Sequence, residues 1–377
     1  MSSRVGLCVA VLAFWVSTAA GKPFIPRDDS AVLAEVTPGA RHSELAARQM
    51  AAQRLDVALP LAQLYIKQSR STGDLRFLGY AEAVLGPWIG PDTQSADALV
   101  LHATVLQSRH DFGGALTVLE RARQLRPNDA QAWLTRATVL RVVGDYQRAL
   151  EACEEIAEPV VVKLCRQGVL GLSGELSSAY AAIQQIDSQG MLPEEHAWRD
   201  SELGEMAVRL GRDVEAEHWF RNGLRASRGD FYIRAAYADL LLRNSRAAEA
   251  LTLLKGQESL EPLLLRIAIA QKMLRDPGLQ RSSERLAAAF AAEAQRGDGV
   301  HRREEARFLL DVRGDPRAAL AAALANWKVQ REPDDVLILM RAAGAAGTPH
   351  SAEPAATFVR EHGLQDVRIP AAMEGQS

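Results

Sequence analysis

Alanine returns on a 34-residue step along this chain, at Ala81, Ala115 and Ala149. Two of these alanines stand in near-copies of one phrase, HDFGGAL at 110–116 and GDYQRAL at 144–150. A period of 34 residues is the length of one helix-turn-helix unit of a solenoid. Such a unit cannot bury its apolar face alone, so units stack, and the stack presents a concave surface suited to holding another molecule. The period therefore predicts the fold and a binding task, but it does not name the bound partner.

Four copies of this unit resemble the tetratricopeptide repeat family. Each copy carries small and aromatic residues at the family's positions in the first helix, the turn and the second helix. The matching residues are His102, Ala103, Asp111, Phe112, Ala115, Leu119, Ala122 and Pro127 in the first copy; Trp133, Ala137, Gly144, Asp145, Tyr146 and Ala149 in the second; Trp198, Leu203, Gly204, Ala207, Gly211, Ala216 and Phe220 in the third; and Tyr237, Ala238, Leu241, Ala250 and Leu254 in the fourth. The resemblance implies an all-α fold, a right-handed α-solenoid of stacked helix-turn-helix repeats, and a protein that binds other proteins.

Weaker copies flank these four. A degenerate copy at 174–179 changes the steps between Ala149 and Ala216 to 30 and then 37 residues. Residues 54–69 and 75–85 predict a helix pair with a lengthened turn, and Pro60 predicts that the first of these helices restarts there, because an interior proline removes a backbone hydrogen bond. Further helices are expected at 262–274, 282–296, 303–312, 316–330, 336–346 and 352–362.

These segments give the expected organisation of the chain. It has a signal peptide at 1–20, an extended segment at 21–43, a degenerate helix-pair region at 44–95, the repeat array at 96–260, degenerate pairs at 261–362 and a flexible tail at 363–377.

Apolar spacing, helix caps and aromatic rings explain why these segments should form helix pairs. Apolar residues recur at spacings of three and four residues, which places them on one helix face. In both near-copies an Asp follows His110 or Gly144, where it can cap the second helix, and the ring of Phe112 or Tyr146 can fill the gap between the helices. The chain is rich in Ala, Leu, Arg and Glu and shows no alternating β pattern, so the all-α interpretation is favoured.

The amino terminus has the pattern of a secretory signal peptide. One basic residue, Arg4, precedes an apolar run at 5–16, and the small residues at 17–20 predict cleavage after Ala20. We therefore expect a periplasmic protein. The alternative is an uncleaved inner-membrane anchor, although the apolar run is shorter than the roughly 20 residues of a membrane span. No later stretch is long and apolar enough for an integral span in the mature chain.

The charge balance argues against one class of partner. Lys and Arg number 44 and Asp and Glu 47, a net charge of −3 that is spread along the chain. A phosphate backbone needs a basic stripe, so no nucleic acid partner is predicted.

Export would leave two cysteines, Cys153 and Cys165, in an oxidising compartment. They fall in adjacent stacked helices, where a disulfide is compatible with the sequence. Two buried free thiols are the alternative, since cysteine is among the most buried residue types.

Motifs of catalysis are not found in the sequence. It contains no His-Glu-x-x-His, no Gly-x-Ser-x-Gly and no phosphate-binding loop, so we expect no enzyme, no cofactor and no metal site. Glu194, Glu195 and His196 together could bind a metal, but after Pro193 they are better explained as an acidic first helical turn.

The concave face is the expected working surface. Its exposed positions recur in register on the first helix of each repeat, at Thr104, Gln107, Thr138, Arg141, Trp198, Glu205, Arg209, Tyr232, Asp239 and Arg243. Ordinary solvated side chains are an equally good explanation for any one of them. Together they suit an extended peptide or a partner helix. The sequence thus predicts a non-enzymatic scaffold that holds a protein or peptide partner in a bacterial envelope assembly, and the alternative is a carrier of lipid or glycan. It does not indicate an oligomeric state.

Overall fold

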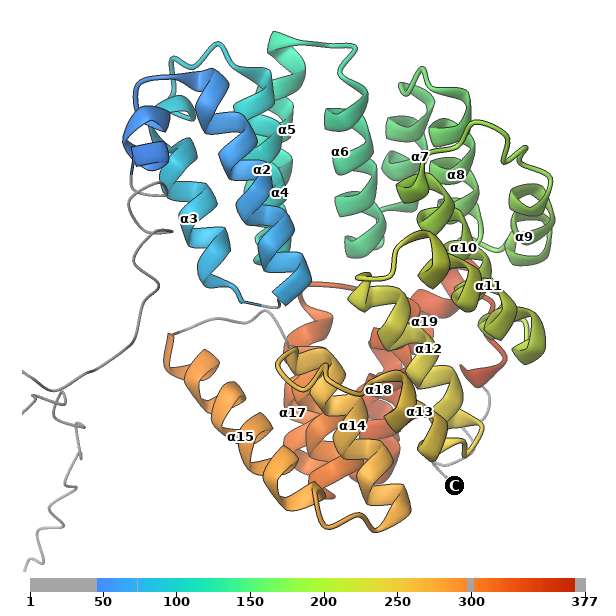
Figure 1. Cartoon of the computed structure of the whole chain (residues 1–377). Coiled ribbons are helices and arrows are strands. Elements are labelled where there is room, and N and C mark those ends of the chain that lie inside the picture. The colour runs from blue at the N-terminus through green and yellow to red at the C-terminus, as the bar shows by residue number, and fades with distance from the viewer. Residues whose placement is uncertain (1–45, 73, 297–301, 370–377) are drawn as a thin grey trace, which may run out of the picture. The chain divides into compact units, whose positions relative to one another are not determined.

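The computed structural model describes residues 46–72, 74–296 and 302–369, and all regular secondary structure within them is helical (Figure 1). The predicted signal peptide, the extended segment at 21–43 and residues 370–377 lie outside the described residues. The described helices follow one another in antiparallel pairs that stack side by side. This is the all-α solenoid that the 34-residue period predicts.

The first pair is α2 (Leu55–Thr72) and α3 (Arg76–Leu85), followed by a short 3₁₀ turn, η1 (Gly86–Trp88). The expectation that the first helix restarts at Pro60 is wrong, because α2 runs through this proline without a break. Pro60 lies in the second turn of α2, where one backbone hydrogen bond is lost. Buried Ala58 and Ala62 on either side hold the helix against α3.

Five helix pairs make up the repeat array. Each has a first and a second helix joined by a short turn: α4 (Ala96–Ser108) and α5 (Phe112–Leu125), α6 (Ala130–Val143) and α7 (Tyr146–Glu154), α8 (Pro159–Leu170) and α9 (Leu176–Gln184), α10 (Pro193–Arg209) and α11 (Asp213–Ala226), α12 (Phe231–Arg243) and α13 (Ala247–Leu253).

The turns are built as the sequence predicts. Asp111 and Asp145 begin the second helices α5 and α7, and the Asp111 carboxylate accepts a hydrogen bond from the Gly114 backbone N–H at 2.9 Å. The rings of Phe112 and Tyr146 are buried beside these caps. The acidic turn before His196 is also a cap, because Glu195 accepts a hydrogen bond from the Leu192 N–H that precedes α10.

The C-terminal helices continue the stack with altered turns. They are α14 (Glu261–Leu274), α15 (Leu279–Arg296), α16 (Arg302–Arg307) with its π-helical extension η2 (Phe308–Arg313), α17 (Pro316–Trp327), α18 (Pro333–Ala345), the 3₁₀ turn η3 (Pro349–Ala352) and α19 (Glu353–His362).

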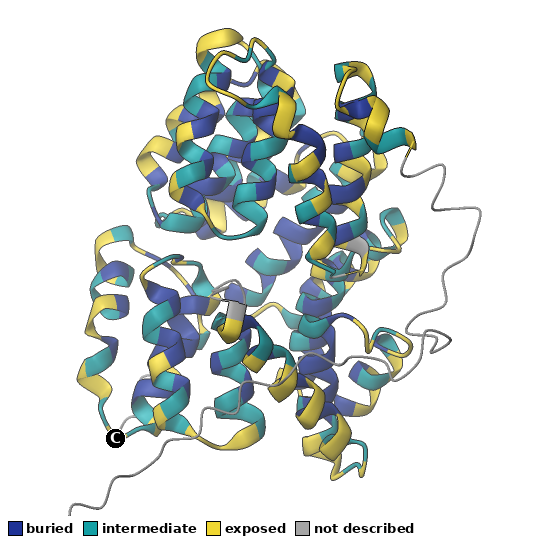
Figure 2. Ribbon diagram, turned by 90° about the vertical axis from the view of Figure 1, so that its left-hand side faces the viewer, coloured by how far each residue is buried: buried dark blue, intermediate teal, exposed yellow. Residues whose placement is uncertain are grey.

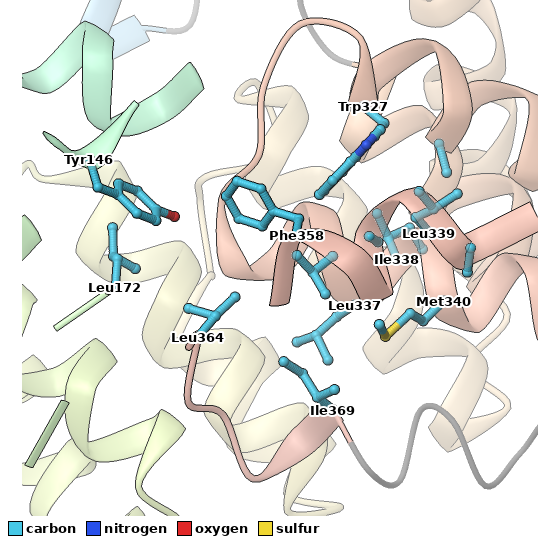
Figure 3. Close-up of a cluster of buried hydrophobic side chains, with 14 of the residues drawn as sticks. Tyr146, Leu172, Trp327, Leu337, Ile338, Leu339, Met340, Phe358, Leu364 and Ile369 are labelled. Carbon is cyan, nitrogen blue, oxygen red and sulfur yellow. The ribbon is translucent and has the colours of Figure 1, made fainter. Parts of the chain in front are cut away.

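These last helices return to the middle of the array. The backbone N–H of Arg331 donates to the carbonyl of Val142 at 2.8 Å, and that of Val367 donates to Arg209 at 3.0 Å. Tyr146 from the array and Phe358 from α19 share one apolar cluster with the side chains of α18 (Figure 3). Buried residues accordingly follow the inner faces of the helices, while their outer faces carry the exposed ones (Figure 2).

The predicted flexible tail is partly ordered. Residues 363–369 pack on the array, with Leu364 and Ile369 buried in the cluster of Figure 3. The Leu176 N–H also donates to the side chain of Gln365 at 3.3 Å. The expectation of a frayed segment from Gly363 onward is therefore wrong up to residue 369. The apolar side chains of Leu364 and Ile369 pack into this cluster. The Gly and Pro content of the segment did not predict that packing.

Candidate binding cavity

The repeats and the returning C-terminal helices surround a cavity of about 480 Å³. Its wall comes from segments far apart in the sequence: the ends of α2 and α4, helices α10 and α12, the start of α14, α16 and the loop before α18. A volume of this size lies within the range of ligand-binding sites. The wall depends on the return of the C-terminal helices, because α16 and the loop before α18 form one side of it.

Part of the predicted groove lies on this wall. The groove residues found there are Gln107, Arg209, Tyr232, Asp239 and Arg243, together with Glu205. They project from the first helices α4, α10 and α12. The repeat register therefore brings side chains from three separate repeats around one space.

Arg141 and Trp198 meet at a carboxylate instead. The Arg141 guanidinium lies 2.5 Å from the Glu202 carboxylate, and the Trp198 indole N–H donates to the same oxygen at 3.2 Å. Burial opposes the charge on Arg141, but the ion pair outweighs it and raises the pKa of the guanidinium. Arg141 thus holds α6 against α10, while the Trp198 bond lies within α10.

Thr104 and Thr138 also bond within the protein. Each hydroxyl donates to a carbonyl one turn earlier in its own helix, at 2.9 Å in both cases. Neither residue lines the cavity.

Arg209 differs from the expectation of a freely projecting groove residue. It is 4% exposed and donates to the Gly171 carbonyl, at the end of α8, at 2.6 Å. Burial lowers the pKa of its guanidinium, and the carboxylates of Asp366 and Glu205 nearby offset part of that effect. A cation at a helix C-terminus is favoured by the helix dipole. The contact of Arg209 with Gly171 therefore stabilises the packing of α10 on α8.

Glu205 of α10 and Tyr232 of α12 both lie on the wall. Burial raises the pKa of Glu205 to about 7, and repulsion from the Glu202 carboxylate adds to the shift. Burial also raises the pKa of Tyr232 well above its usual value. The ring of Tyr232 is 46% exposed, but it faces the cavity, whose wall surrounds it. At neutral pH Glu205 is therefore partly protonated and carries less than a full negative charge.

Asp239 joins three helices. Its carboxylate lies 2.7 Å from Arg266 of α14 and 2.8 Å from Arg307 of α16. Burial alone would raise the pKa of Asp239, but the two guanidinium groups outweigh it and hold the pKa well below its usual value. A carboxylate engaged in this way serves the fold, and it leaves little capacity for a ligand.

Further ion pairs close the wall on the C-terminal side. Arg303 lies 2.9 Å from Glu332, and Arg368 lies 3.0 Å from Asp334. Sequence reasoning missed these four residues, and it also missed Arg70 at the end of α2. They stand outside the clear repeat copies, and the sequence carries no signal for the long-range return that brings them together.

Cys153 and Cys165 form a disulfide in the structure, with Cα atoms 5.7 Å apart. The bond joins α7 to α8, and both residues are buried. It links two neighbouring repeats, and neither cysteine lines the cavity.

Neither a metal site nor a membrane-spanning helix is found among the described residues. Among the described residues, no three His, Cys, Asp or Glu side chains gather as a ligand set for a metal ion. In the part of the chain that the structure covers, none of the helices has both the length and the apolar character for crossing a bilayer.

Comparison with known proteins gives similarity at the level of structure. No protein-family model and no curated protein matches the sequence. The structure of the Cut9–Hcn1 hetero-tetramer of the APC/C is similar, with 12% identity and a TM-score of 0.52 over 85% of this chain and 62% of that one. This chain therefore spans less than two thirds of that protein.

Two further solved structures show weaker similarity. The PilF protein of Pseudomonas aeruginosa has 18% identity and a TM-score of 0.39, over 52% of this chain and 92% of that one. The TPR domain of P58(IPK) has 15% identity and a TM-score of 0.26, over 74% of this chain and 97% of that one. The similarity to Cut9, together with the helix pairs and their turns, shows that the chain has the fold of a tetratricopeptide-repeat solenoid.

Proposed function

We propose that this protein is an exported scaffold that binds a segment of a protein partner in its central cavity, as part of a bacterial envelope assembly. The observation that carries the proposal is the wall of the cavity. It gathers side chains from the first helices of separate repeats, at positions that the repeat register assigns to the concave face. Tetratricopeptide folds generally serve as protein-interaction scaffolds.

The lining of the cavity favours a peptide over a lipid. Arginines and carboxylates from α10, α12, α14 and α16 line it together with Tyr232 and with apolar side chains such as Phe112 and Phe231. An acyl chain placed there would take these ion-paired groups out of contact with water and offer them no hydrogen bond in return, which costs free energy. A peptide brings donors and acceptors of its own. The mixed lining therefore supports the adapter over the lipid carrier.

Export is the second part of the proposal. It rests on the signal-peptide pattern of residues 1–20, and the disulfide between Cys153 and Cys165 fits an oxidising compartment. Amino-terminal sequencing of the secreted protein tests it. A mature chain that begins at Gly21 is expected, while an intact Met1 in the membrane fraction would favour the inner-membrane anchor.

The binding site is tested by filling the cavity. Ala236 lies on the wall, so Ala236→Trp should block entry, while Ala181→Trp places the same ring on the exposed face of α9. Tagged wild-type protein and both variants are used to capture partners from an envelope fraction, and melting temperatures verify their folding. We expect one protein at near-stoichiometric yield with the wild type and Ala181→Trp, and its loss with Ala236→Trp.

Two outcomes would contradict the proposal. Capture of the same protein by a folded Ala236→Trp variant would place the interface on another surface. Recovery of only lipid or glycan with the wild type would favour the carrier.

A further inference from the structure

The turns of three successive repeats meet one C-terminal segment, which consists of α19 and residues 363–369. Each of these turns has a glycine in the left-handed region, and the atoms nearest to a Cβ built on it belong to this segment. The facing pairs are Gly144 with Phe358, Gly174 with Gly363, and Gly211 with Val367. The segment therefore runs along one edge of the array, from turn to turn. We call this contact, together with that of Arg331 on Val142, the seam.

The seam contains no ion pair within the residues that the structure describes. Its hydrogen bonds come mainly from backbone amides: Arg331 to the Val142 carbonyl at 2.8 Å, Val367 to the Arg209 carbonyl at 3.0 Å, and Leu176 to the Gln365 side chain at 3.3 Å. The Arg331 guanidinium adds a long bond to the Val143 carbonyl at 3.4 Å. The arginines of the segment pair with C-terminal residues instead, Arg368 with Asp334 and Asp366, and Arg360 with Glu353. Apolar contact and backbone hydrogen bonds therefore hold the seam closed.

The connection between α12 and the C-terminal helices is of another kind. Asp239 of α12 pairs there with Arg266 of α14 at 2.7 Å and with Arg307 of α16 at 2.8 Å. Separation of these helices would leave largely buried charges without partners, which is strongly destabilising. Separation at the seam breaks no ion pair. The seam is therefore the weaker of these two connections between the array and the C-terminal helices.

The closed seam leaves one buried polar group unsatisfied. Tyr146 is 4% exposed, and its ring faces that of Phe358, with the centroids 5.9 Å apart (Figure 3). The ring of His362 lies against it as well, at 5.0 Å. The Tyr146 hydroxyl is buried and has no hydrogen-bond partner among the described residues. A buried hydroxyl without a partner costs desolvation free energy, which hydration in an open seam would recover.

Both sides of the seam line the cavity. Val142 and Arg209 lie on the array side, and Glu332, Asp334 and Arg368 lie on the C-terminal side. Separation of the two sides would therefore widen the cavity.

We propose that the seam is a gate, which opens while α12 stays joined to α14 and α16, and through which a segment of the protein partner enters the cavity. What enters rests on the proposed function, whereas the opening itself rests on the contacts of the seam. Each side keeps its own ion pairs when the gate opens, so both remain folded.

Hydrogen exchange of the full mature protein tests the opening. The amides of Leu176, Arg331 and Val367 are protected by the seam, so they should exchange together and faster than the buried Leu265 amide of α14, which reports global unfolding. Tyr146→Phe removes only the unsatisfied hydroxyl and should slow exchange of the seam amides about fivefold or more. Tyr237→Phe is the control, because its hydroxyl donates to Glu217 away from the seam, and it should leave their exchange unchanged.

Thiol labelling tests whether the opening gives access to the cavity. Ala236→Cys places one free thiol on the wall of the mature protein, because Cys153 and Cys165 are bonded to each other and Cys8 lies in the predicted signal peptide. The variant is labelled with small N-ethylmaleimide and with bulky fluorescein maleimide. Adding Phe358→Ala should speed the bulky reagent about tenfold or more, since the ring no longer fills the seam, and adding Tyr146→Phe should slow it. The small reagent should react at similar rates in all three proteins.

Two results would overturn the gate. Exchange of the seam amides at the rate of the Leu265 amide would mean that the seam opens only when the protein unfolds. Fluorescein labelling that does not follow seam exchange from variant to variant would mean that the opening does not lead to the cavity. Neither measurement uses the partner. If both give the expected result while Ala236→Trp leaves partner capture intact, the gate stands and the proposed function fails.

Discussion

The ring of Phe358 fills the space where a side chain at Gly144 would stand. A Cβ atom at Gly144 would lie 2.7 Å from the ring, and Gly144 has a φ of 84°, in the left-handed region. The same turn glycine therefore ends α6 and lets α19 dock. This one residue links the local geometry of a repeat to the return of the C-terminal helices.

Gly144→Ala should destabilise the protein. The left-handed conformation alone costs a residue with a Cβ about 1–2 kcal/mol, and displacement of the Phe358 ring adds to that. Thermal unfolding followed by circular dichroism measures the effect. Gly113→Ala is the control, because its Cβ would meet no atom within 4 Å and its backbone is helical. A Gly144→Ala variant that melts with the wild type would show that α19 does not dock as described.

Ala149→Phe tests the register of the repeats. Ala149 is fully buried where α7 meets its neighbours, so a larger side chain overpacks the interface and should cost about 1–3 kcal/mol. Ala248→Phe, on the exposed face of α13, should leave the melting temperature nearly unchanged. Equal melting temperatures for the two variants would contradict the 34-residue register.

Arg141→Ala should destabilise the fold. Its partner Glu202 is largely buried, and removing the guanidinium leaves that carboxylate without its counter-charge, which costs about 3 kcal/mol. Arg148→Ala removes an exposed pair with Asp145 and should cost less than about 1 kcal/mol. Denaturant unfolding compares the two. Equal stability of both variants would mean that the ion pair between α6 and α10 contributes nothing.

The sequence predicts local structure well because helices depend on nearby residues. The expected helix at 262–274 is α14 (Glu261–Leu274), and the expected caps at Asp111 and Asp145 are present. The cavity could be predicted only in part. The register places Tyr232 and Asp239 on the concave side, but the burial of Arg209 depends on segments more than 30 residues away. Contacts such as that between Arg331 and Val142 leave no periodic signal in the sequence.

Glu205 should make stability depend on pH. Its pKa in the folded protein is about 7, above the 4.5 of an ordinary glutamate, so the folded state binds more protons than the unfolded state between these values. Stability should therefore fall as the pH rises from about 4.5 to 7, by an amount on the order of 1–3 kcal/mol.

Glu205→Gln isolates this contribution. The amide cannot ionise, so the variant should lose stability more slowly than the wild type as the pH rises from 5 to 8, in denaturant unfolding at several pH values. Asp335, whose pKa burial raises to about 6, contributes with the same sign and stays in both proteins, so the difference between them reports Glu205 alone. A difference that does not change with pH would mean that Glu205 is ionised throughout this range.

Arg70→Gln should leave the protein as stable as the wild type. The Arg70 side chain is exposed at the end of α2 and, among the described residues, makes neither an ion pair nor a side-chain hydrogen bond, so the change breaks no bond and should alter stability by less than about 0.5 kcal/mol. Thermal unfolding measures the effect, with Arg141→Ala as the comparison. A loss of stability in Arg70→Gln comparable to that of Arg141→Ala would show that the Arg70 guanidinium supports the fold.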